Sequence, residues 1–209
     1  MERTVVDAET PSPAHAVARR GLSGPLDTDG VALNHYRIPP GEGFPSGLHT
    51  HADQEEIFVV LEGVATFETL AGSGENENEV TGGAPASPRT GHEVRVEAGE
   101  AIRFAPGEYQ SGYNREDEAL VALAIGAPRE STDVRVPVRC PECGDADLGL
   151  DSGGERLSFV CPACDAERVP ASCPDCGADG MGLTLDDANT VVAACESCGA
   201  EFETPPFRE

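Results

Sequence analysis

The chain has 209 residues, and its 38 acidic against 14 basic side chains give a formal charge of −24 at pH 7. Every basic residue is Arg, and there is no Lys. This balance argues against nucleic acid as a partner, because proteins bind the phosphate backbone mainly through Lys and Arg. No apolar run approaches the roughly 18 residues of a membrane span, and the N-terminus has no apolar signal region. We therefore expect a cytoplasmic protein without a membrane segment.

The acidic surface also predicts a salt-rich setting. At about 1 M salt the Debye length shrinks to about 3 Å, so surplus surface charge keeps a protein soluble at little electrostatic cost. The Lys-free, acid-rich composition resembles that of proteins from salt-loving archaea. We interpret the charge as halophilic adaptation rather than as a functional acidic patch.

In chain order, residues 1–27 form an N-terminal extension, within which residues 14–20 (AHAVARR) have the composition of one or two helical turns. Residues 28–125 contain short Val, Ile and Phe runs punctuated by Gly and Pro, which are typical of strands. Their number predicts a β-barrel or sandwich. Residues 71–91 have no periodicity and almost no large apolar side chain, which predicts a mobile surface loop.

A cluster of potential metal ligands lies in the segment GFPSGLHTHADQEEIFVVLEG. His49 and His51 are two residues apart, so both imidazoles point to the same face of a strand. Glu56 follows a short polar stretch, and a hairpin would bring it back beside them. Two neutral imidazoles and one carboxylate suit Fe, Mn, Ni or Zn with open coordination positions.

These residues carry a family resemblance. The spacing from Gly43 through His49, His51 and Glu56 to Gly63 resembles the complete first motif of the cupins. The second cupin motif is matched by residues 99–114, GEAIRFAPGEYQSGYN, except that Gln110 stands where the family has its third metal-binding His. The resemblance implies a cupin-type antiparallel β-barrel, or jelly roll, over residues 28–125. It also implies one divalent metal in the barrel, bound by His49, His51, Glu56 and Gln110.

The amide oxygen of Gln110 is a harder and weaker ligand than imidazole, so a soft late metal would be held less firmly. The alternative is that the His and Glu residues form a hydrogen-bonded polar cluster in an empty barrel. The remaining strand histidines, His35 and His92, are interpreted as ordinary strand residues rather than as parts of a site.

Residues 126–138, GAPRESTDVRVPV, are polar and contain Pro, which indicates a linker. All eight cysteines follow it, in four Cys-x-x-Cys pairs. The pairs belong to a tandem repeat, 139–169 and 170–204, that is too short to bury a substantial core. Two Cys-x-x-Cys turns together complete a tetrahedral four-thiolate site.

The CPxCG sequences resemble the zinc ribbon family, which implies two structural zinc ions whose binding supplies the folding energy of each module. The repeat favours one site formed by Cys140, Cys143, Cys161 and Cys164 and a second formed by Cys173, Cys176, Cys195 and Cys198. A rival pairing joins the two middle pairs across residues 165–172. Disulfides and a rubredoxin-like iron site are the competing uses of the thiols, and a cytoplasmic setting disfavours the disulfides.

Two functions remain open at this stage. In the first, the barrel metal binds a small oxygen-bearing molecule, and the protein is an enzyme of the dioxygenase or isomerase class. In the second, the barrel is a non-catalytic sensor of a small molecule or metal, and the zinc ribbons contact a protein partner. The cupin resemblance also implies a homodimer formed through a barrel edge.

Overall fold

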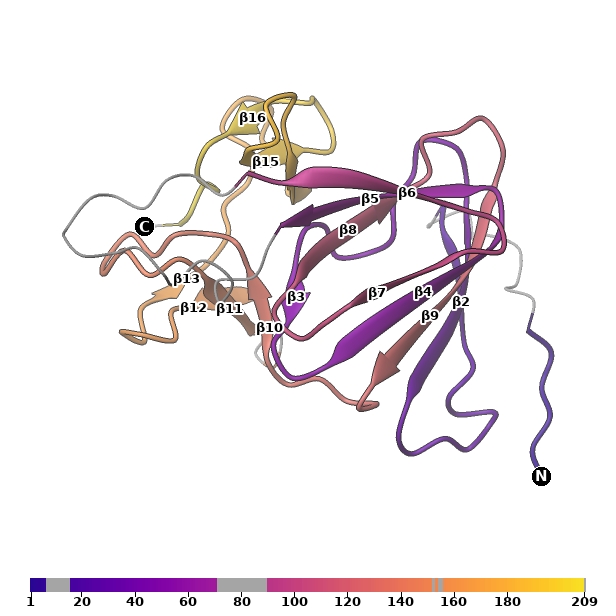
Figure 1. Cartoon of the computed structure of the whole chain (residues 1–209). Helices are drawn as coiled ribbons and strands as arrows, with labels where there is room; N and C mark the ends of the chain where they lie inside the picture. The colour runs from indigo at the N-terminus through magenta and orange to yellow at the C-terminus, as the bar shows by residue number, and fades with distance from the viewer. Residues whose placement is uncertain (7–15, 71–89, 152, 154–155, 209) are drawn as a thin grey trace.

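The computed structural model describes residues 1–6, 16–70, 90–151, 153 and 156–208. In these residues all regular structure is β, in sixteen strands and without a helix (Figure 1). The described part of the chain accordingly has no helix that is long and apolar enough to cross a membrane. The prediction of a mainly β protein is confirmed.

Two antiparallel sheets face each other and form a sandwich (Figure 1). The larger sheet has the order β1-β2-β9-β4-β7, and the smaller has the order β6-β5-β8. The larger consists of β1 (Ala18–Gly21), β2 (Ala32–Ile38), β4 (Glu55–Glu62), β7 (Ala101–Phe104) and β9 (Leu120–Ala127). The smaller consists of β5 (Val64–Leu70), β6 (His92–Glu97) and β8 (Tyr109–Tyr113).

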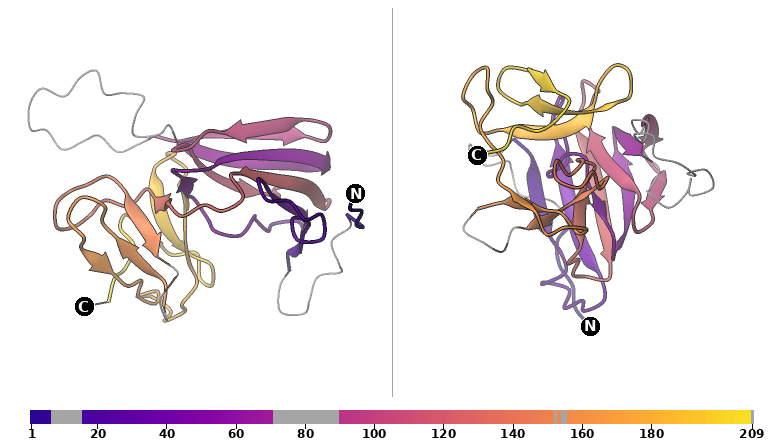
Figure 2. Two further views of the ribbon diagram at one scale, coloured as in Figure 1. Left: turned by 90° about the horizontal axis from the view of Figure 1, so that it is seen from below. Right: turned by 90° about the vertical axis from the view of Figure 1, so that its left-hand side faces the viewer.

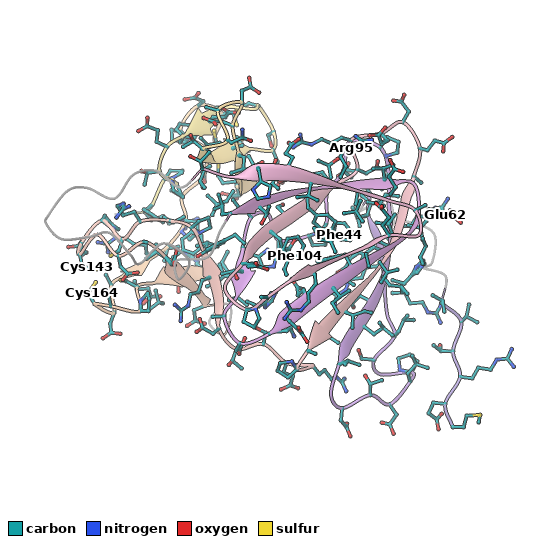
Figure 3. The ribbon with its side chains drawn as sticks, in the orientation of Figure 1. Phe44, Glu62, Arg95, Phe104, Cys143 and Cys164 are labelled. Carbon is teal, nitrogen blue, oxygen red and sulfur yellow. The ribbon has the colours of Figure 1, made fainter. Side chains whose placement is uncertain are left out.

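One hydrophobic core lies between these two sheets. Phe58 from the larger sheet and Phe67 from the smaller are buried with ring centroids 4.9 Å apart, and Phe44 packs against both. Figure 3 shows Phe44 and Phe104 pointing into the space between the sheets. A Cβ on Gly112 would lie 2.6 Å from the Phe67 ring and 2.7 Å from the Phe44 ring, so the rings leave room for glycine only.

The N-terminal segment differs from its prediction. Residues 18–21 form β1, which pairs with β2 from Ala18↔Arg37 to Gly21↔Asn34, so the helical turns expected at residues 14–20 are wrong where the structure describes them. The free edge of β2 supplies backbone partners, and Val17 packs on the core. Tertiary pairing thus outweighs the weak local helix propensity of this segment. Most of the loop predicted at residues 71–91 lies outside the described residues.

The C-terminal third forms two small modules, which we name module 1 (residues 139–169) and module 2 (residues 170–204). Module 1 contains β11 (Leu148–Asp151), β12 (Ser158–Val160) and β13 (Glu167–Arg168). Module 2 contains β14 (Met181–Leu185), β15 (Val191–Cys195) and β16 (Glu201–Phe202). Both modules lie at one end of the sandwich, away from the N-terminus (Figures 1 and 2).

Module 1 is joined to the sandwich by hydrogen-bonded strands. The segment predicted as a linker contains β10 (Val134–Val136), and β10 pairs with β11 on one side and with β3 (Thr50–His51) on the other. The resulting five-stranded sheet has the order β13-β12-β11-β10-β3. Module 1 is therefore continuous with the strand that carries His51.

Module 2 is joined to the sandwich by packing, by isolated backbone hydrogen bonds and by one buried carboxylate. Leu48 is fully buried and packs with Leu183 of β14, whose carbonyl accepts the Leu48 N–H at 2.9 Å. Glu68 on β5 is 1% exposed and accepts hydrogen bonds from Thr184 Oγ1 at 2.8 Å and from the Leu185 N–H at 3.1 Å. Arg115 donates to the same carboxylate at 2.7 Å.

Candidate metal centres

The eight thiols form two clusters of four. Within each cluster the four sulfur atoms lie within 4.8 Å of one another. The clusters are the two that the repeat favours, so the rival pairing of the middle Cys pairs is not formed. The members are Cys140, Cys143, Cys161 and Cys164 in module 1, and Cys173, Cys176, Cys195 and Cys198 in module 2.

The sulfur spacing fits a tetrahedral zinc site. Sulfur pairs in module 1 are 3.8 Å and 3.5 Å apart, and the matching pairs in module 2 are 3.8 Å and 3.6 Å apart. A tetrahedron with Zn–S bonds of about 2.3 Å has sulfur atoms about 3.8 Å apart, whereas a disulfide bond is about 2.0 Å long. The cysteines are free, so the disulfide alternative is not formed.

Each Cys-x-x-Cys turn has the same backbone frame. The Cys140 carbonyl accepts the N–H of Gly144, and the Cys161 carbonyl accepts that of Asp165. These turns aim further N–H groups at the sulfurs. The N–H of Cys143 is the main cause that lowers the pKa of the Cys140 thiol to about 7, and in module 2 the N–H of Cys198 acts in the same way on Cys195. In the same clusters the pKa of Cys164 and of Cys198 is raised to about 12, because the neighbouring thiols outweigh the backbone N–H groups of Ala166 and Ala200. Each cluster thus contains a thiol that forms the thiolate readily, which is the form that a metal requires.

The third cluster lies in the sandwich. His49, His51 and Glu56 place one ligand atom each within 4.8 Å of one another. His49 precedes the two-residue strand β3 that carries His51, and Glu56 lies on β4 after a short turn. Gln110 on β8 is hydrogen-bonded through its backbone to His49, with N–O distances of 2.8 Å and 3.1 Å. The structure thus brings all four sequence-predicted residues together.

The surroundings of His49 fix its tautomer. Nδ1 lies 2.8 Å from the carbonyl oxygen of Gly47. A carbonyl can only accept, so Nδ1 carries a proton, and in the neutral imidazole the lone pair is then on Nε2. Gly47 has φ of +60°, a conformation that glycine adopts without strain, and its carbonyl oxygen contacts the ring at Nδ1.

The His51 ring is also hydrogen-bonded through Nδ1, in this case to a side chain. Its Nδ1 lies 2.8 Å from the hydroxyl oxygen of Ser131, and Nε2 lies 3.7 Å from Oε2 of Glu56. Burial lowers the pKa of His51 below its ordinary value, although the Glu56 carboxylate acts in the opposite direction. A neutral imidazole with a free Nε2 lone pair is the form that binds a metal ion.

Gln110 directs its amide nitrogen toward the cluster. Nε2 donates to Oε2 of Glu56 at 2.9 Å and lies 3.5 Å from Nε2 of His49. Gln110 is 4% exposed and His49 is 8% exposed, so these contacts are shielded from solvent. For Oε1 to bind a cation, the side-chain amide of Gln110 would have to turn by about 180°. This turn exchanges the positions of Oε1 and Nε2.

Two further histidines of the described residues, His35 and His92, do not belong to this cluster. His35 is buried in β2, opposite Leu123 of β9, and His92 begins β6 at the surface.

Sequence reasoning did not identify Ser131, Asp53 or Glu68. Ser131 lies in the predicted linker, and only the pairing of β10 with β3 brings it to His51. The one available signal was that Asp53 lies two residues from His51 in a turn, where a short carboxylate commonly caps backbone or hydroxyl groups. No local pattern marks Glu68, because its partners are in module 2.

The residues of the sandwich match a known protein family. Residues 34–126 match the family model described as "Cupin domain". No curated protein sequence is similar enough to the chain to count as a match.

Several solved structures have a backbone arrangement similar to that of this chain, and three of them are as follows. A candidate sugar phosphate isomerase from Acidithiobacillus ferrooxidans is 19% identical over 69% of this chain and 75% of its own, with a TM-score of 0.46. An oxalate oxidase in complex with glycolate is 18% identical over 64% of this chain and 61% of its own, with a TM-score of 0.47. The oxalate decarboxylase of Lactobacillus farciminis is 17% identical over 60% of this chain and 32% of its own, with a TM-score of 0.43. The match to the family model shows that residues 34–126 form a cupin domain.

Proposed function

We propose that the protein is a metal-binding cupin with two structural zinc ribbons. In this proposal one divalent ion is held by His49, His51 and Glu56, and Gln110 turns its amide so that Oε1 faces the ion. The observation that carries the proposal is that both imidazoles are hydrogen-bonded through Nδ1, which leaves both Nε2 lone pairs directed into one shielded cluster. Such orientation of His ligands by hydrogen bonds to the other ring nitrogen is typical of metal sites.

We further propose that a small oxygen-bearing molecule is the ligand of this ion. Four protein groups leave coordination positions open on an Fe, Mn or Ni ion, which prefers about six ligands when its donors are nitrogen and oxygen. A bound ion would polarise an oxygen atom of the ligand, which is the chemistry shared by the dioxygenase and isomerase classes. The chain's own contribution is to orient the ligating groups and to keep them partly shielded from water.

Elemental mass spectrometry tests the metal part of the proposal. We expect protein purified in high salt without added metal to contain about two zinc ions per chain, one for each Cys cluster, and a third metal in the cupin domain. The His49→Ala/His51→Ala variant should lose the third metal and keep the zinc. Equal metal content in the two proteins would overturn the assignment of the third ion.

A second candidate function is a sensor in which the modules respond to the state of the cupin domain. The observation that favours it is the pairing of β10 with both β3 and β11, which links His51 to module 1 through backbone hydrogen bonds. Hydrogen exchange tests it. Adding Mn(II) to zinc-loaded protein should slow exchange in β10 and β11 of the wild type and leave the His49→Ala/His51→Ala variant unchanged.

A further inference from the structure

The segment between β9 and β10 lies against the turn that follows His51. The Ala52 N–H donates to the Asp133 carbonyl at 2.8 Å, and Gln54 Nε2 donates to the Pro128 carbonyl at 2.5 Å. Between these two contacts, Asp53 accepts the Thr132 N–H at 2.8 Å. The segment is therefore held along the turn at both ends and in the middle, which fixes the position of Ser131.

The direction of each hydrogen bond at Ser131 follows from its partners. The hydroxyl group donates its single proton to Oδ1 of Asp53, with an oxygen–oxygen distance of 2.5 Å. Only its lone pairs then remain for Nδ1 of His51, 2.8 Å away, so Nδ1 must be the donor. The chain Asp53–Ser131–His51 thus holds the imidazole with its proton on Nδ1 and its lone pair on Nε2.

We propose that Ser131, held by Asp53, is a positioning residue for the metal in the cupin domain. The proposal rests on the proposed function, because it assigns Ser131 the task of fixing the tautomer and ring orientation of one ligand of that metal. The two imidazoles are supported differently. His49 is oriented by the backbone of Gly47 inside the cupin domain, whereas His51 is oriented by a side chain outside residues 34–126.

This difference connects the metal site with module 1. Ser131 lies three residues before β10, whose partner on its other edge is β11 of module 1. The affinity for the metal therefore depends on the segment that attaches module 1. Loss of the groups around one His ligand typically lowers metal affinity by a factor of about 10 to 100.

The test compares three variants of the full, zinc-loaded chain. Ser131→Ala removes the acceptor of His51 Nδ1–H, and Ser131→Thr keeps a hydroxyl group at that position. The matched control is Thr132→Val, which removes a 3.0 Å hydrogen bond to the same Asp53 carboxylate from a residue that does not contact the imidazole. We expect Mn(II) affinity to fall about 10-fold or more in Ser131→Ala, and to stay within about twofold of wild type in Thr132→Val. Ser131→Thr should restore it.

A second readout does not depend on the metal. The ¹⁵N chemical shifts of the His51 ring, measured on zinc-loaded protein without Mn(II), should show a single Nδ1–H tautomer in wild type and a mixture in Ser131→Ala. Unchanged shifts and unchanged Mn(II) affinity in Ser131→Ala would overturn the role of Ser131. If wild type itself binds no Mn(II), the proposed metal function fails, and the ring shifts alone then decide whether Ser131 orients His51.

Discussion

Module 1 and module 2 are copies of one repeat, yet they are attached to the cupin domain in different ways. Their four-thiolate clusters have nearly the same sulfur spacing and the same turn hydrogen bonds. Module 1 continues a sheet through β10 into β3, whereas module 2 packs Leu183 on Leu48 and offers two donors to Glu68. The cluster of four cysteines is thus common to both copies of the repeat, whereas the attachment differs between them.

Removing one thiol from each module should have the largest effect. We expect Cys161→Ser and Cys195→Ser each to lose one zinc ion and to unfold the affected module, because zinc supplies on the order of 10 kcal/mol of folding free energy in such small domains. Cys161→Ser should weaken Mn(II) binding in the cupin domain more than Cys195→Ser, since module 1 is paired with β10 beside Ser131, whereas module 2 reaches the site only through Leu48, next to His49. Zinc content and Mn(II) titration measure both effects. Equal weakening by the two variants would remove the distinction between the modules.

Truncating the apolar contact of module 2 should have the next largest effect. Leu48 is 0% exposed and packs beneath β14, so Leu48→Ala should lower the free energy of unfolding by about 3 kcal/mol through the cavity that it leaves. Urea unfolding followed by circular dichroism measures this loss. A loss below about 1 kcal/mol would mean that module 2 does not depend on this contact.

The buried carboxylate at the same contact should contribute less. Glu68→Ala removes the acceptor of the Thr184 hydroxyl and of the Leu185 N–H, and leaving these partly buried donors unpaired costs about 2 kcal/mol. Glu93 pairs with Glu68 across β5 and β6 and also contacts Arg115, but it is exposed. Glu93→Ala is therefore the matched control, with an expected cost below about 0.5 kcal/mol. Similar losses in the two variants would show that Arg115, and not module 2, accounts for the role of Glu68.

The two modules also show which parts of this protein can be read from sequence. A site of four cysteines consists of short Cys-x-x-Cys turns, and the geometry of each turn is determined within five residues. The hydrogen bond from the Gly144 N–H to the Cys140 carbonyl is an example. The cluster of His49, His51 and Glu56 is nearly as local, because a two-residue spacing and one turn suffice to bring the three side chains together. Both patterns were therefore predictable, and so was the mainly β fold with its short strand runs.

The attachments were not predictable, because they depend on partners far apart in the sequence. Ser131 reaches His51 across 80 residues, and Thr184 reaches Glu68 across 116. Polar residues and Pro dominate the segment around Ser131, so its sequence predicts a linker. Strand β10 in this segment nevertheless forms, because it pairs with β3 and β11, and these partners cannot be predicted from the local sequence. The N-terminal strand β1 was missed for the same reason, since the open edge of β2 selects its conformation.

The smallest expected effect is a difference in how the two attachments respond to acid. Burial raises the pKa of Glu68 above its ordinary value, so the pH-dependent part of its contribution to stability is complete below about pH 4.5 and is lost as pH rises through the raised pKa. Asp53, at the attachment of module 1, behaves oppositely. The Ser131 hydroxyl lowers its pKa from 3.8 to about 2, so its contribution is present above pH 3.8 and is lost as pH falls toward 2.

Double differences between variants and wild type isolate these opposite signs, because zinc loss at low pH affects all of the proteins alike. The free energy of unfolding of wild type minus that of Glu68→Gln should decrease as pH rises from 4.5, and wild type minus Asp53→Asn should decrease as pH falls below 3.8. Urea unfolding across this pH range supplies both curves. Two curves with the same sign would contradict the opposite pKa shifts of Glu68 and Asp53, and the distinction between the modules would then rest on their backbone pairing alone.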